Sequence, residues 1–276
     1  MKLSCLPVSL FQDIAAGKMS IFDWADLAKD AGLDALDLSI LSIQNNTTNY
    51  LENINTELQN RQMDIAMITT YPNFTHPNPL QRERELDYCF HDIALASQLG
   101  AAYLRITAGP QYPDMDIGKM AEQVAHYFLL CENKADQYGI KLVYENHGRP
   151  GAWKNYDFTY DPKAFLALTR KLKGSKVRVN FDTANTAAFG INPVPIFEVV
   201  FSQVETIHVA DTVAYGIFQH VAIGTGAAPI IEILDIAKKK GFDGWLCIEE
   251  GSGLGAAGIR QAVQTVRNMW SRSFSA

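Results

Sequence analysis

The chain has 276 residues and a formal net charge of −6, with 47% hydrophobic and 20% charged residues. This composition is typical of a globular protein with a sizeable core, and it excludes disordered chains, fibres and small disulfide scaffolds. An acidic balance without a run of Lys and Arg lacks the charge pattern that phosphate-backbone binding requires, so we expect no nucleic-acid partner. No apolar stretch approaches the roughly 18 residues of a membrane-spanning helix, so we expect no membrane partner either.

The cysteines and the first residues bear on the cellular compartment. Cys5, Cys89, Cys131 and Cys247 lie far apart without a CxxC pair, so we expect free thiols rather than a zinc knuckle or a dithiol redox motif. The opening MKLSCLPVSLF contains one lysine and a short apolar run broken by Pro7, and we interpret it as a first strand rather than a signal peptide. Together these features predict a cytoplasmic protein.

In chain order, short β-rich runs alternate with longer segments of helical apolar spacing, as in successive βα units. The predicted strands are 2–8, 35–40, 63–70, 102–108, 141–146, 177–182, 204–210 and 245–250. Glycines typical of helix C-termini precede several of them, at Gly32, Gly100, Gly139, Gly174 and Gly241. No linker or shift in composition divides the chain. Eight strand–helix repeats predict an α/β fold, a single (β/α)8 TIM barrel, with residues 1–276 forming one domain.

Reacting groups in such barrels lie at the C-terminal ends of the strands. The last four predicted strands end in carboxylate, amide or imidazole groups: Glu145, Asn146 and His147, then Asp182 and Asn185, then His208 and Asp211, then Glu249 and Glu250. One such residue alone is more often a helix cap or a hydrogen-bonded core residue than a ligand. Four consecutive strands with such ends predict a divalent metal site, of the Mn, Mg or Co kind rather than a thiolate-rich zinc site.

The motifs at these strand ends also carry a resemblance to a known family. The succession YENHG, NFDTAN, IHVAD, GTG and FDGWLCIEE, clearest from about residue 95 to 250, resembles the xylose-isomerase-like TIM-barrel superfamily. That superfamily includes sugar phosphate isomerases and epimerases, ketose 3-epimerases, hydroxypyruvate isomerases, inosose dehydratases and endonuclease-IV-type enzymes. Its metal ligands correspond here to Glu145, Asp182, His208 and Glu249. Glu249 is preferred over Glu250 because it closes the DGWLxIE phrase, and strand alternation turns Glu250 away.

Departures from the family pattern exclude one of its branches. Endonuclease-IV-type enzymes bind three metal ions with extra histidines, one of them three residues after the strand-six aspartate, where this chain has Asn185. Their Asp-x-His pair before the GxG turn is replaced here by Phe218-Gln219-His220. A trinuclear centre is therefore not expected, and neither is DNA cleavage.

The resemblance implies a mechanism that depends on one divalent metal ion. Mn²⁺ is expected first, with Co²⁺, Mg²⁺ or Zn²⁺ as alternatives. Such an ion would chelate a substrate carbonyl and the neighbouring hydroxyl and stabilise an enediolate, while Glu145 and Glu249 act as acid and base. We therefore predict a sugar or polyol isomerase or epimerase acting on a small-molecule substrate. A metal-dependent dehydratase of the inosose or keto-acid type is the alternative, and a non-catalytic carbohydrate-binding barrel is the second.

Three further residues are candidates for substrate binding. His147 lies two residues beyond Glu145 on the same side of its strand, which suits a substrate hydroxyl or a proton relay, or a structural role in the loop. Arg105 is flanked by apolar residues and alternates into the barrel, where it either contacts substrate or neutralises carboxylates. Asn185 occupies the position of the family histidine and is expected to hydrogen-bond substrate.

Other features leave alternatives open. The Gly224-Thr225-Gly226 turn either cradles a phosphate or is a tight loop, and because no Lys or Arg follows it through residue 237 we favour an unphosphorylated substrate. Asp211 either supports a ligand or caps the next segment. Aromatic residues in the loops at the strand ends either stack on a sugar or pack a lid: Tyr71, Phe74, Tyr112, Trp153 and Tyr156. The apolar outer helices permit a homo-oligomer.

Overall fold

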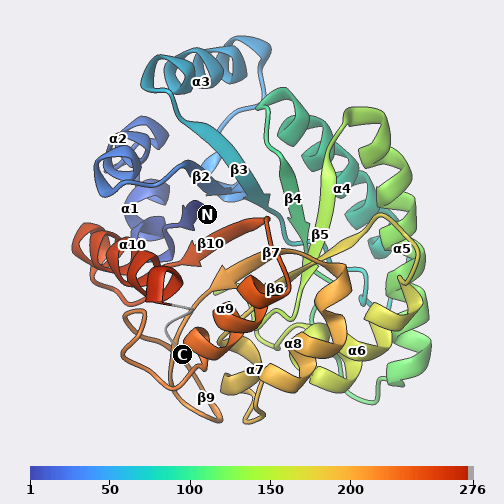
Figure 1. The fold of residues 1–276 in the computed structure, drawn as a ribbon. Helices are drawn as coiled ribbons and strands as arrows, with labels where there is room; N and C mark the ends of the chain where they lie inside the picture. The colour runs from blue at the N-terminus through green and yellow to red at the C-terminus, as the bar shows by residue number, and fades with distance from the viewer. Residues whose placement is uncertain (273–276) are drawn as a thin grey trace.

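The computed structural model describes residues 1–272, in which eight parallel strands form a nearly closed barrel surrounded by helices (Figure 1). The strand order is β1-β10-β7-β6-β5-β4-β3-β2, and the two end strands contact each other. These strands are β1 Lys2–Leu6, β2 Ala35–Ser39, β3 Asp64–Thr69, β4 Tyr103–Ile106, β5 Lys141–Glu145, β6 Arg178–Asp182, β7 Val204–Val209 and β10 Trp245–Glu249. The predicted TIM barrel is confirmed.

Helices cover the outside of the barrel. They are α1 Phe11–Ala15, α2 Ile21–Ala31, α3 Thr48–Arg61, α4 Pro79–Gln98, α5 Ile117–Tyr138, α6 Pro162–Lys171, α7 Asn185–Ala188, α8 Val194–Val200, α9 Ile230–Lys239 and α10 Gly255–Arg272. Local sequence sets their ends. The Asp116 carboxylate accepts a hydrogen bond from the Lys119 amide at the start of α5, and Gly139 ends that helix with φ 69°. The other four predicted glycines also have positive φ, so they match the expected helix C-termini.

Most strands end earlier than the sequence predicts, for a reason visible in their last residues. The predicted strand 102–108 is observed as β4, because the Thr107 hydroxyl turns to donate to the Pro72 carbonyl. After β5, the Asn146 side chain bonds the backbone of Asp182 instead of extending the strand. At this end of the barrel, hydrogen bonds made by side chains take the place of the backbone hydrogen bonds between strands.

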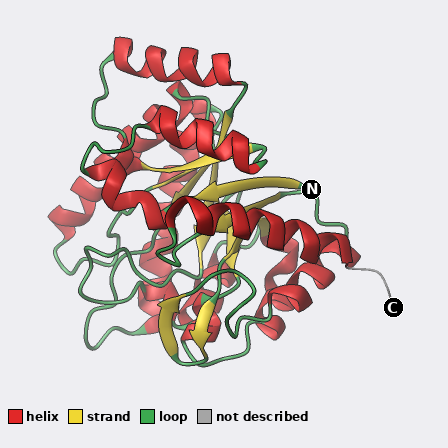
Figure 2. Ribbon diagram, turned by 90° about the vertical axis from the view of Figure 1, so that its left-hand side faces the viewer, coloured by secondary structure: helices red, strands yellow, loops and turns green. Residues whose placement is uncertain are grey.

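The sequence did not predict a small hairpin, β8 Thr212–Ala214 and β9 Ile217–His220, between β7 and α9. Figure 2 shows these two short antiparallel strands among the loops, apart from the barrel strands. Strands of three and four residues are too short to give a periodic signal.

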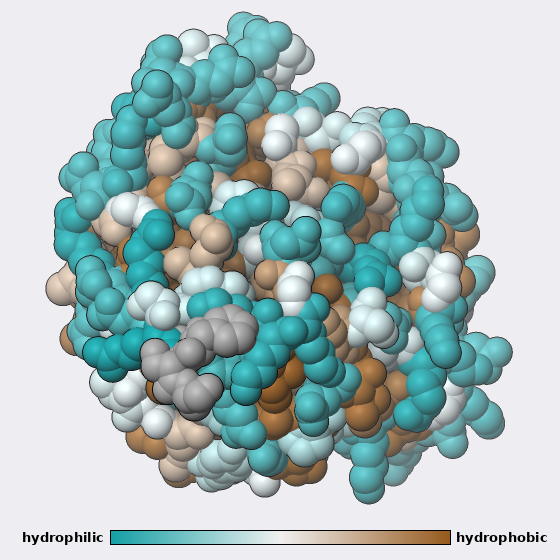
Figure 3. Space-filling view, viewed as in Figure 1, coloured by the Kyte–Doolittle hydropathy of each residue, from teal (hydrophilic) through white to brown (hydrophobic). Residues whose placement is uncertain are grey.

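The core follows the alternation of the strands. On β4, Leu104 and Ile106 pack outward in the main hydrophobic cluster with the helices, whereas Tyr103 faces the barrel interior beside Met67 and Val143. All four cysteines are buried and free, as predicted. The face of the molecule in Figure 3 is mostly hydrophilic, and within residues 1–272 no helix has the length and apolarity needed to cross a membrane.

Candidate metal centre

Four neighbouring strands bring the predicted ligands together at the C-terminal end of the barrel. Glu145 ends β5, Asp182 ends β6, His208 lies on β7 and Glu249 ends β10. One potential ligand atom from each residue can be chosen so that all four atoms lie within 4.8 Å of one another. His208 Nδ1 lies 3.1 Å from Glu249 Oε2 and 3.4 Å from Glu145 Oε2.

The donor set suits a divalent cation. Glu145 Oε2 and Asp182 Oδ2 are buried without a hydrogen-bond partner among the described residues, and a buried carboxylate is costly unless it is paired or binds a metal. Arg105 adds one positive charge 3.4 Å from Glu145 Oε2. With His208 neutral, three ionised carboxylates and one guanidinium leave two negative charges, which a divalent ion balances. Carboxylate and imidazole donors without thiolate suit Mn, Mg, Co or Zn.

The electrostatics of these residues point the same way. Burial alone would raise the pKa of Glu145, but His208 and Arg105 outweigh burial and hold this pKa well below its usual value. Burial likewise opposes the charge on His208, yet Glu145 and Glu249 raise its pKa well above the usual value. Burial, together with Glu145 and Glu249, raises the pKa of Asp182. In the absence of a cation, the negative charge of the cluster therefore favours the protonated forms of Asp182 and His208.

Two of the three predicted substrate-binding residues, Arg105 and Asn185, contact Glu145, whereas His147 lies two residues beyond Glu145 and faces Asp157. Arg105 is 2% exposed, and its Nε and Nη1 have no hydrogen-bond partner among residues 1–272. The Asn185 amide donates to Glu145 Oε1 at 3.2 Å. The imidazole of His147 is buried next to Asp157, with Nδ1 3.8 Å from Asp157 Oδ2. Asp157 was not identified from the sequence, because it lies in a loop that no strand pattern marks.

The structure corrects the phosphate-cradle alternative for the Gly224-Thr225-Gly226 turn. The amides of Gly224 and Gly226 donate to Asp211 Oδ2 at 2.9 and 2.8 Å, and the amide of Thr225 donates to the Ala222 carbonyl. These donors are already used, so they do not form an anion-binding cradle. Asp211 is the cap of this turn rather than a support for a metal ligand.

The other half of the barrel presents hydroxyl groups from Tyr71, an aromatic residue singled out in the sequence, and from Thr69 and Ser39, which were not singled out. The Tyr71 hydroxyl lies 3.0 Å from Thr69 Oγ1 and 3.3 Å from Ser39 Oγ, and the Arg105 guanidinium lies 5.1 Å from the centre of the Tyr71 ring. Phe74, in contrast, is fully buried and stacks on Tyr127 with ring centres 5.1 Å apart. It belongs to the core and not to a sugar-binding surface.

The β8–β9 hairpin packs against the loop that follows β5. A Cβ atom at Gly148 would come within 2.2 Å of the Phe218 ring, so a larger residue there would force the Phe218 side chain to move. Phe218 also meets the Tyr156 ring edge-on, with ring centres 5.4 Å apart. On the same strand, the His220 ring packs against Gly251, two residues beyond Glu249.

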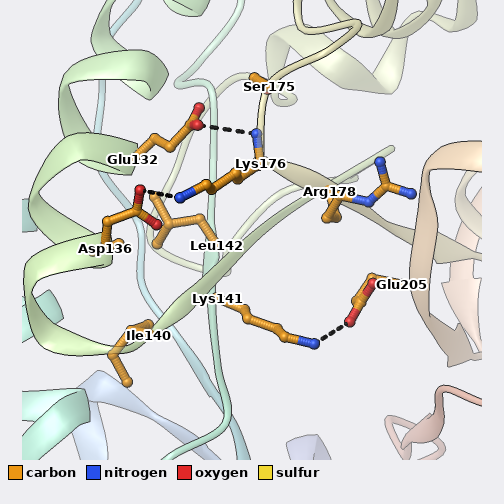
Figure 4. A pocket seen from close by; sticks show the side chains of 10 residues that line it. Glu132, Asp136, Ile140, Lys141, Leu142, Ser175, Lys176, Arg178 and Glu205 are labelled. Atoms are coloured by element: carbon orange, nitrogen blue, oxygen red, sulfur yellow. Dashed lines mark hydrogen bonds and ion pairs between the residues drawn. The ribbon is translucent and has the colours of Figure 1, made fainter.

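A separate cavity of about 380 Å³ lies at the opposite end of the barrel, where Lys141, Arg178 and Glu205 stand near the starts of their strands (Figure 4). Its charged groups bond to one another: Lys141 Nζ lies 2.8 Å from Glu205 Oε1, and Lys176 pairs with Asp136. Because these charges are already paired and reacting groups in TIM barrels lie at the other end, this cavity is not a candidate site.

Comparisons with known proteins agree with the fold. The sequence profile of the xylose isomerase-like TIM barrel family matches residues 25–269, whereas no curated protein matches the sequence. Similar solved structures include the IOLI protein with a binding zinc atom, at 16% identity over the full length of both chains with a TM-score of 0.83. A D-tagatose 3-epimerase-like protein has 15% identity over 99% of this chain and 98% of its own, with a TM-score of 0.79. The probable 3-DHS dehydratase AsbF from Bacillus anthracis has 16% identity over 97% of this chain and 99% of its own, with a TM-score of 0.78.

Proposed function

The chain belongs to the xylose isomerase-like TIM barrel family, and we propose that it is a divalent-metal-dependent isomerase or epimerase of an unphosphorylated sugar or polyol. The observation that carries this proposal is the cluster of four buried or half-buried ligand-type residues, Glu145, Asp182, His208 and Glu249, with potential ligand atoms within 4.8 Å of one another. Mn²⁺ is the ion we expect first, and the IOLI structure with zinc makes Zn²⁺ a second candidate.

The two glutamates are suited to proton transfer. A bound divalent ion would act as a Lewis acid on the substrate carbonyl and make the neighbouring C–H bond more acidic. Glu145 and Glu249 occupy the two ends of the arc β5-β6-β7-β10, so they approach a substrate in the barrel mouth from different directions. One carboxylate takes the proton from carbon, and the other carboxylic acid returns a proton to the opposite face, which inverts that carbon. Return of the proton to the adjacent carbon instead gives isomerisation.

Arg105, Asn185 and His147 would hold and orient the substrate. Arg105 Nε faces Glu145 Oε2, whereas Nη1 has no hydrogen-bond partner among residues 1–272 and would suit a substrate hydroxyl or carbonyl oxygen. Asn185 fixes Glu145 by donating to Oε1, so that the other oxygen stays directed at His208 and Arg105. We expect no phosphate group on the substrate, because the amides of Gly224 and Gly226 already donate hydrogen bonds to Asp211 and are not available to bind phosphate.

A dehydratase is the second candidate function. Its first half-reaction is the same proton abstraction, after which a β-hydroxyl leaves as water instead of the proton returning to carbon. His147 near Glu145 bears on this candidate, since an imidazolium there could protonate a departing hydroxyl, whereas a neutral ring with its only proton on Nδ1 could not. The similarity to the probable dehydratase AsbF is consistent with it.

Proton exchange in D₂O tests the proposal across several classes of carbonyl compound at once. The purified protein is loaded with Mn²⁺, incubated with ketoses, inososes and keto acids, and followed by NMR. We expect deuterium to enter next to the carbonyl of at least one compound, and the product then separates epimerase, isomerase and dehydratase. Glu145→Gln should slow this exchange by about 10²- to 10⁴-fold, the usual contribution of a general base.

Glu205→Gln is the matched control, because Glu205 is a half-buried carboxylate at the other end of the barrel. It should leave exchange unchanged. If the wild type bound none of Mn²⁺, Co²⁺, Mg²⁺ or Zn²⁺ and exchanged no compound, the proposal would be wrong. A carbohydrate-binding barrel without catalytic activity would then account for the fold.

A further inference from the structure

The loop between β5 and α6 folds back and places a buried carboxylate beside His147. The Asp157 amide donates to the Gly148 carbonyl at 2.7 Å, and the next amide, of Phe158, donates to the Gly109 carbonyl at 2.8 Å. These two bonds close the neck of the 148–157 loop and tie it to the loop after β4. The Asp157 side chain is fully buried at this neck.

The Asp157 carboxylate organises the end of β5. Its Oδ1 accepts the Thr159 amide at 2.8 Å and lies 2.7 Å from the Thr159 hydroxyl. That hydroxyl also lies 2.7 Å from the Glu145 carbonyl oxygen and accepts the His147 amide at 3.2 Å. The other oxygen, Oδ2, accepts the Gly109 amide at 3.3 Å and lies 3.8 Å from His147 Nδ1. Asp157 is therefore linked to the backbone at Glu145 and to both the backbone and the side chain of His147.

The two ring nitrogens of His147 have different surroundings. Nδ1 is buried and has no hydrogen-bond partner among residues 1–272, and Asp157 Oδ2 is the carboxylate oxygen beside it. No hydrogen bond from those residues engages Nε2 either, but Nε2 is not among the buried unpaired atoms. An ionised carboxylate only accepts hydrogen bonds, so a proton on Nδ1 suits this arrangement and a lone pair on Nδ1 does not.

We propose that Asp157 is a positioning residue, which holds His147 as the Nδ1–H tautomer and leaves Nε2 free to accept a hydrogen bond from a substrate hydroxyl. When Nδ1 of a neutral imidazole carries the proton, Nε2 has a free lone pair and accepts a hydrogen bond. The 3.8 Å separation is longer than a hydrogen bond, so Asp157 favours the Nδ1–H form as the acceptor that faces Nδ1, and such contacts commonly tighten further in the complex. The role in substrate binding rests on the proposed function, whereas the tautomer does not.

This arrangement specifies the chemistry that His147 recognises. An Nε2 without a proton can only accept a hydrogen bond. It therefore selects a substrate that carries a hydroxyl at this position rather than a carbonyl or an ether oxygen. Sites built to hydrogen-bond a hydroxyl reject analogues that lack it much more strongly than apolar pockets reject an extra group. A deoxy analogue at this position should therefore be a poor substrate.

Tautomer measurement by NMR tests the positioning role directly. The protein is labelled with ¹⁵N-histidine, and its ring nitrogens are observed at about pH 8, where an ordinary imidazole is neutral. His147→Gln identifies the His147 signals by their loss. We expect the wild type to show the Nδ1–H tautomer, and Asp157→Asn to shift His147 towards the Nε2–H form. Finding Nε2–H at His147 in the wild type would overturn the proposal.

Asp161→Asn is the matched control. Asp161 lies four residues further along the same segment, and its carboxylate caps α6 through the Lys163 amide. This substitution removes the same charge without facing His147, so it should leave the His147 tautomer unchanged. The Asp157→Asn variant keeps an oxygen for the Thr159 amide, and thermal unfolding checks that it folds.

Turnover provides the second readout, with the substrate identified by deuterium exchange. Asp157→Asn should lower kcat/KM by about 10- to 100-fold, taking as a guide the loss seen when the partner that orients a metal-binding histidine is removed. In a His147→Gln background, Asp157→Asn should have no further effect, because its role passes through that ring. If the losses in kcat/KM of the two substitutions multiplied in the double variant, Asp157 would only stabilise the loop. If no compound is turned over, the proposed function fails, while the tautomer measurement still decides the role of Asp157.

Discussion

The half of the barrel built by β5, β6, β7 and β10 ends in three carboxylates and an imidazole, whereas the half built by β1 to β4 ends in hydroxyl groups and one arginine. The hydroxyl groups satisfy one another, since Tyr71 lies within hydrogen-bond distance of both Thr69 and Ser39. In the first half, Glu145 Oε2 and Asp182 Oδ2 are buried without hydrogen-bond partners among residues 1–272.

This difference indicates which half binds a cation. Hydroxyl groups that pair with each other cost little to bury. In contrast, Asp182 Oδ2 has no partner among residues 1–272, and Glu145 Oε2 has only the Arg105 and His208 nitrogens, each 3.4 Å away. We therefore expect the cation in the first half, and we expect the second half to face the substrate of the proposed reaction. Arg105 connects them, because it stands on β4 and contacts Glu145 on β5.

Two adjacent glutamates provide the strongest test of this contrast. Glu249 faces His208, whereas Glu250 turns away and accepts the Ser252 amide at 3.1 Å. Glu249→Gln should reduce deuterium exchange by about 10²- to 10⁴-fold, as expected for a lost acid or base. Glu250→Gln is the control and should retain exchange within about tenfold of wild type. Equal losses in the two variants would contradict the assignment of the ligand.

Removing the arginine that links the halves should mainly affect stability. Arg105→Met leaves the buried Glu145 without its guanidinium partner, and breaking a buried pair on one side costs about 3–5 kcal/mol of unfolding free energy. Urea denaturation measures this loss, and added Mn²⁺ should recover part of it by supplying positive charge. Arg149→Met, at an exposed position in the loop after β5, should change little. An unchanged stability of Arg105→Met would show that Arg105 does not neutralise the site.

Asp37 is an exception within the hydroxyl half. Burial raises its pKa from 3.8 to about 6, although His208 and a hydrogen bond from Ser4 partly offset this effect. Between these two values the folded protein binds more protons than the unfolded chain, so stability falls as pH rises through this range. A shift of about two units corresponds to about 3 kcal/mol.

Asp37→Asn should therefore raise the unfolding free energy of the metal-free protein by up to about 3 kcal/mol near neutral pH, with no gain below about pH 4. Denaturation curves across this pH range measure the difference. Asp64→Asn, at the exposed start of β3, is the control and should show no such pH dependence. A loss of stability at neutral pH would mean that ionised Asp37 is stabilised by the fold.

The smallest effect is expected from the hydroxyl cluster itself. Tyr71→Phe removes hydrogen bonds to Thr69 and Ser39 but keeps the ring beside Arg105. The unfolding free energy should fall by about 0.5–1.5 kcal/mol, the net value of one hydrogen bond, and Mn²⁺ affinity should not change. A large loss of metal affinity would place Tyr71 in the metal centre and break the division between the halves.

The sequence predicted the barrel well because its strands are short apolar runs separated by helical periodicity. The acidic residues at the strand ends could also be predicted, because Glu145 and Asp182 each follow an apolar run. Asp37 was missed because a single aspartate between two leucines gives no sign of its hydrogen bond with Ser4 on β1, the strand that meets β2 where the barrel closes.

Contacts between loops could not be predicted from the sequence. Asp157 and Thr159 reach the end of β5 only because the chain folds back through Gly148. The glycine turn at 224–226 was open to two interpretations, and only the position of Asp211 decided between them. Such contacts depend on tertiary folding and leave no periodic signal along the chain.

The central claim is tested most directly by calorimetric titration of the metal-free wild type with Mn²⁺. Repeating the titration in buffers of different ionisation enthalpy measures the protons released on binding. The raised pKa values of Asp182 and His208 predict one binding site whose occupation by Mn²⁺ releases protons. Affinity should therefore increase with pH, and Asp182→Asn should abolish or strongly weaken it. Absence of binding, or equally tight binding without proton release in both proteins, would contradict a metal centre built from these four residues.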